Sequence, residues 1–139
     1  MKRILWIIAT ILVVAIAHTL NLFDAAMGNP ATIYNVLTTV GYIAFWILYL
    51  VLNKSERKRL TFSCVISGIT FFCSCLITII NFTNIVLRPG TFVQILTFFS
   101  IPFYGVRFFV HNMAWCMIVI TIINCIWFGF SVFIKRRRK

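Results

Sequence analysis

Acidic residues are almost absent from this chain: of its 139 residues, only Asp24 and Glu56 carry a side-chain carboxylate. They lie in different polar segments, which we expect on opposite sides of a membrane, so they cannot act as a catalytic acid/base pair. The chain also lacks a phosphate-binding glycine loop, a nucleophile elbow, a dithiol redox motif and metal-ligand spacing. We predict a protein that is not an enzyme and that takes no cofactor or metal. An enzyme using His18 or His111 is the alternative.

Charge of either sign is scarce, and apolar residues take its place. The chain is 62% hydrophobic and 11% charged, whereas soluble domains are about 45–50% apolar and about 25% charged. Its net charge of +11 comes from short basic runs beside long apolar stretches. Membrane proteins distribute their basic residues in this way, so we expect no nucleic-acid partner. The sequence indicates a protein whose main solvent is lipid.

Four apolar stretches are long enough to cross about 30 Å of hydrocarbon as helices, which takes about 20 residues each. They comprise residues 4–23, 32–52, 60–87 and 108–134. Helices are expected because an open strand would leave backbone polar groups unsatisfied in lipid. The first stretch resembles a cleavable secretory signal, but its apolar run continues to spanning length and is interpreted as a membrane helix. The predicted fold is all-α: one domain, residues 1–139, forming an antiparallel up-down bundle of four transmembrane helices.

The connections between these stretches differ in length. Residues 24–31 contain the turn signal Gly28-Asn29-Pro30, and residues 53–59 are equally short, so two tight antiparallel hairpins are expected. Residues 88–107 form a longer connection. Within it, residues 91–100 are rich in aromatics but too few to span, which predicts a short interfacial or re-entrant helix between the third and fourth membrane helices.

Basic residues are distributed unevenly between the two predicted sides of the membrane. Eleven of the 13 lie at the N-terminus, in residues 53–59 and in the tail, residues 135–139, whereas Arg88 and Arg107 fall on the other side. Cytoplasmic segments are enriched in Lys and Arg, so both termini are predicted in the cytoplasm and the protein in the plasma membrane or a bacterial inner membrane. The same segments are expected to attract anionic lipids at the cytoplasmic face.

A stripe of small or hydroxyl-bearing residues follows one face of the third predicted helix, within about 80° of arc. Its members, together with one amide on the fourth helix, are Ser63, Ser67, Thr70, Ser74, Thr78 and Asn124. Small residues let membrane helices approach closely, which favours a helix-packing role. The alternative is a polar track for an ion or solute.

Larger polar residues gather toward the predicted outer side of the membrane. The candidate ligand-binding cluster comprises His18, Asn21, Asp24, Asn81, Asn84, Arg88, Arg107 and His111. A salt bridge from Asp24 to one of the arginines would be a structural role for part of this cluster. Alternatively, a guanidinium there binds an anionic group such as a lipid phosphate or a peptide carboxylate.

These patterns predict a small non-enzymatic multi-pass protein that binds a lipid, a peptide or a partner membrane protein at its outer-leaflet face. An accessory subunit of a transporter, or an immunity-type protein against a membrane-active peptide, would fit. The alternative is a small transporter or channel, with the third helix lining the path. Four helices rarely enclose a pore, so this alternative requires a homo-oligomer.

Overall fold

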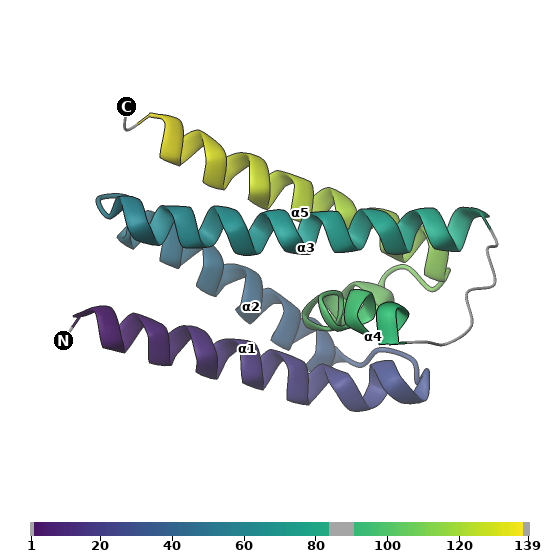
Figure 1. The fold of residues 1–139 in the computed structure, drawn as a ribbon. Coiled ribbons are helices and arrows are strands. Elements are labelled where there is room, and N and C mark those ends of the chain that lie inside the picture. The colour runs from purple at the N-terminus through teal and green to yellow at the C-terminus, as the bar shows by residue number, and fades with distance from the viewer. Residues whose placement is uncertain (1, 84–90, 138–139) are drawn as a thin grey trace.

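The computed structural model of the chain describes residues 2–83 and 91–137, with side chains for residues 4–83 and 94–137. Its long helices are α1 (Lys2–Met27), α2 (Ile33–Leu52), α3 (Arg57–Thr83) and α5 (Met113–Arg136) (Figure 1). All four are long and apolar enough to cross a membrane, which confirms the predicted number of spans. Two short elements, α4 (Thr91–Phe98) and the 3₁₀ helix η1 (Ile101–Phe108), separate α3 from α5. The described residues contain no strand.

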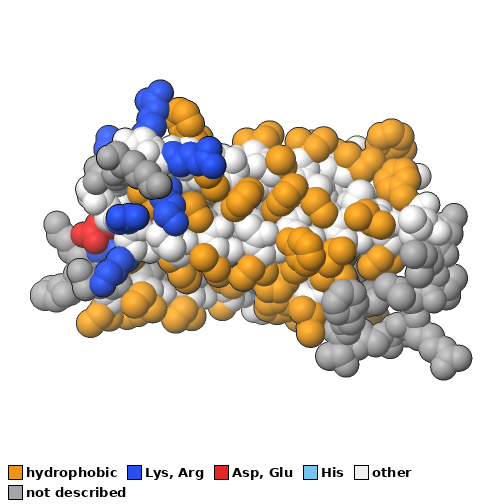
Figure 2. Space-filling view, turned by 45° about the horizontal axis from the view of Figure 1, so that its top comes forward, with side chains coloured by type: hydrophobic (Ala, Val, Ile, Leu, Met, Phe, Trp, Pro, Cys, Tyr) orange, Lys and Arg blue, Asp and Glu red, His pale blue; other side chains and the backbone are white. Residues whose placement is uncertain are grey.

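The long helices form two pairs that are joined at one end by short elements. α3 packs along α5, while α1 and α2 pack on each other and on η1. The start of α1, the end of α5 and the turn between α2 and α3 lie at one end of the molecule, and α4 lies between α1 and α3 toward the other (Figure 1). Lys and Arg side chains gather at the first of these ends, here called the basic end (Figure 2). Beyond the basic end, hydrophobic side chains are spread along the face shown, among backbone and uncharged polar atoms (Figure 2).

Helix ends follow from local capping chemistry. α1 ends before Gly28, whose φ of 67° is a conformation that favours glycine. The Asn29 N–H bonds the Asp24 carbonyl at 3.0 Å, as in a Schellman cap. At the start of α2, the Asn35 side chain accepts from the Thr32 N–H at 2.6 Å, the reciprocal half of a capping box. The Gly28 turn and this capping interaction therefore redirect the chain at the end opposite the basic end.

Three predicted boundaries differ from the structure by three residues or more. α1 continues to Met27 instead of ending at residue 23, because the left-handed turn comes only at Gly28. The last long helix begins at Met113 instead of residue 108, since Asn112 caps it by accepting from the backbone N–H groups of residues 114 and 115. α3 begins at Arg57, three residues early. Residues 84–87, predicted as its end, lie outside the described residues.

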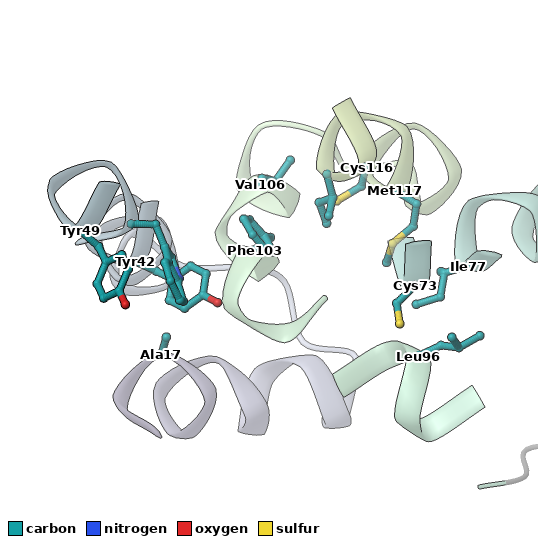
Figure 3. Packing of buried hydrophobic residues seen from close by; sticks show 12 residues of the cluster. Ala17, Tyr42, Tyr49, Cys73, Ile77, Leu96, Phe103, Val106, Cys116 and Met117 are labelled. Atoms are coloured by element: carbon teal, nitrogen blue, oxygen red, sulfur yellow. The ribbon is translucent and has the colours of Figure 1, made fainter. Parts of the chain in front are cut away.

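η1 forms the centre of the packed core. Its Phe103 is 1% exposed and meets the Tyr42 ring of α2 edge-on, with ring centroids 5.5 Å apart. Figure 3 shows Phe103 between Tyr42 on one side and Cys116 and Met117 of α5 on the other. A 3₁₀ segment thus occupies the space where the two helix pairs would otherwise separate.

Candidate functional site

The predicted outer cluster is in part a scaffold for α4 and η1. Asn21 of α1 is fully buried, and its side-chain N–H groups lie 3.1 and 3.2 Å from the carbonyls of Ile101 and Pro102. His18, one turn earlier, has Nε2 3.0 Å from the Phe98 carbonyl and stacks on the Phe98 ring with centroids 4.2 Å apart. Both side chains therefore lie against backbone carbonyls at the end of α4 and the start of η1.

Two buried residues of α2 complete this scaffold, and the sequence-based cluster did not include them. Asn35 donates from Nδ2 to Asn21 Oδ1 at 3.1 Å. Thr39 donates to the Pro102 carbonyl at 2.9 Å and accepts from the Gly105 N–H at 3.0 Å. Asn35 and Thr39 are four residues apart, which places them on one helix face, and this spacing is the signal that could have identified them.

Arg107 reaches the turn after α1 through a tyrosine. Its Nη1 donates to the Tyr104 hydroxyl at 2.9 Å, and that hydroxyl bonds the backbone carbonyls of Asp24, at 3.2 Å, and Asn29. The Asp24 carboxylate accepts from Asn29 Nδ2 at 3.3 Å. Within the described residues, the link between η1 and this turn is therefore a chain of hydrogen bonds and not a salt bridge between Asp24 and Arg107.

The remaining members of the predicted cluster do not join this scaffold. Asn81 donates to the Ile77 carbonyl of its own helix at 3.0 Å. His111 is exposed between η1 and α5. Asn84 and Arg88 lie outside the described residues. Of the predicted cluster, the structure thus joins His18, Asn21 and Asp24 to α4 or η1, and Arg107 lies within η1.

The stripe on α3 faces α5 over most of its length. Ser63, Ser67, Thr70 and Ser74 are at most 3% exposed. Ser63 pairs with Ser131 across the interface at 3.4 Å, and Thr78 pairs with Thr121 at 2.9 Å.

Thr78 also donates to the Met117 carbonyl of α5 at 3.2 Å, and the remaining bonds of Ser67, Thr70 and Ser74 stay within α3. Ser67 and Thr70 each donate to the carbonyl four residues earlier at 2.8 Å. Asn124 lies on α5 between Thr121 and Ser131, the two residues of α5 that pair with the stripe. It is fully buried, and its amide has no hydrogen-bond partner among the described residues.

A groove runs between α1 and α3. It consists of two adjoining cavities of about 370 and 390 Å³, both lined by Thr10, Ile11 and Phe62. The first opens at the basic end beside Trp6 and Arg59. The second continues to His18 and Phe98, where α4 and η1 close it. We call the two together the α1/α3 groove.

The wall of the α1/α3 groove is largely apolar. Its aliphatic members include Ile7, Val14 and Ile66. The Thr10 hydroxyl donates to the Trp6 carbonyl at 2.8 Å, so this group is already satisfied within α1. The groove exists because α1 packs mainly on α2 and η1 while α3 packs on α5, and it suits an elongated apolar molecule better than a polar solute.

No group of three or more His, Cys, Asp or Glu side chains that could hold a metal ion occurs in the described parts of the chain. The ring nitrogens Nδ1 and Nε2 of His18 lie 2.8 and 3.0 Å from the backbone carbonyls of Val14 and Phe98, and a neutral imidazole donates to one of them. Comparisons with models of known protein families, with curated proteins and with solved structures find no match.

Proposed function

We propose that this chain is a non-enzymatic multi-pass protein of the plasma membrane or a bacterial inner membrane that binds the acyl chain of a lipid in the α1/α3 groove. The observation that carries the proposal is the continuity of the two groove cavities through Thr10, Ile11 and Phe62. A binding role agrees with the expectation from sequence. We place the site at the side of the bundle instead of the outer polar surface, because His18 and Asn21 of that surface already lie against the backbone carbonyls of Phe98, Ile101 and Pro102.

The orientation in this proposal follows the positive-inside rule. Eleven of the 13 basic residues belong to the N-terminus, the α2–α3 turn region and the C-terminal tail, and Lys and Arg gather at one end of the molecule in Figure 2. We therefore assign the basic end to the cytoplasm. α4 and η1 then lie toward the outer side, with residues 101–106 of η1 buried in protein, as backbone that departs from the α-helical bonding pattern must be at membrane depth.

The dimensions of the groove favour a lipid chain. Trp6 and His18 mark its two ends on α1, and twelve residues of helix span about 18 Å. One leaflet contributes about 15 Å to the hydrocarbon core. A groove of this length, open at the basic end and closed at the other by α4 and η1, matches one acyl chain of the adjacent leaflet.

The alternative, a homo-oligomeric transporter or channel with α3 lining the path, has one observation in its favour. The amide of Asn124 is buried in the membrane interior without a partner among the described residues. The stripe beside it, however, is closed by α5, and its hydroxyls bond α3 carbonyls or residues of α5. A flux through proteoliposomes that Asn124→Leu abolishes would favour transport over lipid binding.

Two tryptophan substitutions on α1 test the acyl-chain proposal. Ile11 lines both cavities, so Ile11→Trp should fill the groove, whereas Leu12 is similarly exposed and lines neither. Native mass spectrometry of the detergent-solubilised protein would measure retained lipid. We expect Ile11→Trp to lower retention at least about fivefold, equivalent to about 1 kcal/mol, and Leu12→Trp to leave it unchanged. Equal retention in both variants, or none in the unsubstituted protein, would refute the proposal.

A further inference from the structure

The opening of the α1/α3 groove at the basic end, here called the mouth, is lined by charged side chains, whereas the rest of the groove is largely apolar. Lys58, Arg59 and Glu56 line this mouth together with the rings of Trp6 and Tyr49. Arg59 is half-buried and donates from Nη1 to Asn53 Oδ1, which fixes the guanidinium beside the opening. Lys58 is exposed. The groove is therefore amphipathic along its length, with cations at one end and apolar side chains beyond them.

The positive charge at the mouth is unfavourable within the protein itself. Arg57, Lys58 and Arg59 form the first turn of α3, where the helix dipole disfavours cations. Residues 54–59 hold four basic side chains and one carboxylate, that of Glu56. An anion supplied from outside the chain would compensate this excess, and anionic lipid head groups are the anions found at this depth of a cytoplasmic leaflet.

The aromatic residues at the mouth indicate the depth of the head group. Trp6 and Tyr49 meet edge-on with ring centroids 5.2 Å apart. Both line the mouth beside Lys58 and Arg59. Trp and Tyr favour the level of the membrane interface, where the apolar chains meet the head groups. A lipid chain lying in the groove would therefore place its phosphate at the height of the two cations.

We propose that the ligand is an anionic phospholipid of the cytoplasmic leaflet, with its phosphate held by Lys58 and Arg59 and one acyl chain extending along the groove toward His18. This inference rests on the proposed function and adds the chemical class of the lipid. Charge complementarity at the mouth selects this occupant over a partner helix. A helix of a second copy would bring another largely apolar surface against the cations and leave them uncompensated.

Lys58 and Lys54 offer a matched test. Both are exposed lysines of the same basic segment, but only Lys58 lines the groove. The purified protein would be equilibrated in detergent with equal amounts of phosphatidylglycerol and phosphatidylcholine, and retained lipid measured by native mass spectrometry. We expect the unsubstituted protein to prefer phosphatidylglycerol. Lys58→Gln should lower this preference about fivefold, the effect of one basic residue near a membrane surface, while Lys54→Gln leaves it unchanged.

The outcomes separate the two proposals. Equal preferences in the Lys58→Gln and Lys54→Gln variants, or no preference in the unsubstituted protein, would overturn the head-group assignment alone. Retention insensitive to Ile11→Trp would overturn the groove itself. A dimer that persists in detergent and dissociates on Ile11→Trp would show that a second copy covers the groove, and it would overturn both. Arg59→Gln serves as a second variant, with circular dichroism to confirm that loss of the Asn53 bond leaves the helices intact.

Discussion

At the scale of single residues, buried polar side chains are what make a 3₁₀ segment possible inside a membrane protein. Backbone groups that lack α-helical partners must find other hydrogen-bond partners where water is absent. Asn21 and Thr39 both bond the Pro102 carbonyl, and Thr39 also accepts from the Gly105 N–H. One amide and one hydroxyl, from two different helices, thereby fix η1 in place.

Gly105 provides the sharpest test of this arrangement. A Cβ at residue 105 would lie 2.7 Å from Thr39 Oγ1 and closer still to the Asn35 carbonyl oxygen. Gly105→Ala should therefore force η1 away from α2 and destabilise the protein by about 1–3 kcal/mol. Unfolding in mixed micelles with increasing mole fraction of dodecyl sulfate, followed by circular dichroism, would measure the change.

Gly41→Ala is the matched control for Gly105→Ala. Gly41 lies within α2, and a Cβ there would meet no atom within 4 Å. Because Ala has a higher helix propensity than Gly, this variant should be as stable as the unsubstituted protein or more stable by up to about 1 kcal/mol. If the two variants unfolded at the same detergent composition, η1 would not pack against α2 as described.

The sequence predicted some of the polar side chains that bond α4 and η1, but it did not predict that they bond backbone carbonyls there. His18 and Asn21 could be selected because large polar side chains are costly in a membrane helix. Their partners, the carbonyls of Phe98, Ile101 and Pro102, lie about 80 residues further along the chain. Residue type alone does not reveal such a pairing, because any residue has a backbone carbonyl. The candidate cluster did not include Tyr104, because a tyrosine near a helix end is also typical of an interface anchor.

At the scale of helices, the close approach of α3 and α5 depends on side-chain size. Ser63 and Ser67 are fully buried at this interface, and a Cβ at Gly68 would lie 3.2 Å from the Phe128 ring of α5. Between membrane helices, packing must supply the attraction that water supplies in soluble proteins. The stripe therefore has a structural role in the described residues whether or not it has another.

Two substitutions of Ser67 distinguish the effect of side-chain size on stability from the effect of the hydroxyl group. Ser67→Leu should separate α3 from α5 and destabilise the bundle by about 1–3 kcal/mol. Ser67→Ala should change stability by about 0.6 kcal/mol or less, because the hydroxyl bonds its own helix and such bonds are weak in membranes. The same detergent-unfolding measurement applies. A larger loss from Ser67→Ala than from Ser67→Leu would contradict a packing role.

The four long helices could be predicted because each is a long apolar run, and length alone distinguishes a membrane span. The start of α5 could not be predicted, because the apolar residues Phe108, Phe109 and Val110 precede it and were included in the same predicted run, although Phe108 is part of η1. The decisive group is Asn112, whose side chain caps the helix. A single N-cap residue predicts a helix start less strongly than an apolar run does, so the predicted helix began too early.

At the scale of the whole molecule, η1 lies between the two helix pairs, and α2 also meets α5 directly through the rings of Trp46 and Trp127, whose centroids are 4.8 Å apart. Only 11% of the α1 span is buried, against 39% of the α3 span. α1 is thus exposed along most of its length, and the groove beside it is a consequence of this arrangement. No pattern along the sequence predicts such a gap, because it depends on how the pairs are held apart and not on any one helix.

Orientation is a property of the entire chain, and two cysteine variants test it. In a background with the five native cysteines replaced by Ala, Ser55→Cys reports on the α2–α3 turn and Ala26→Cys on the end of α1; both positions are exposed and at opposite ends. The positive-inside rule predicts that a membrane-impermeant maleimide labels only Ala26→Cys in intact cells, and Ser55→Cys only after permeabilisation.

Labelling of Ser55→Cys in intact cells would show that the molecule has the opposite orientation in the membrane. The mouth of the groove, with Lys58 and Arg59, would then face the outer leaflet. The charge argument would still select an anionic phosphate, but the lipid would have to come from the other side of the membrane. Because the acyl chain follows the groove for about 18 Å from whichever surface the mouth faces, this labelling experiment also decides which leaflet supplies the ligand.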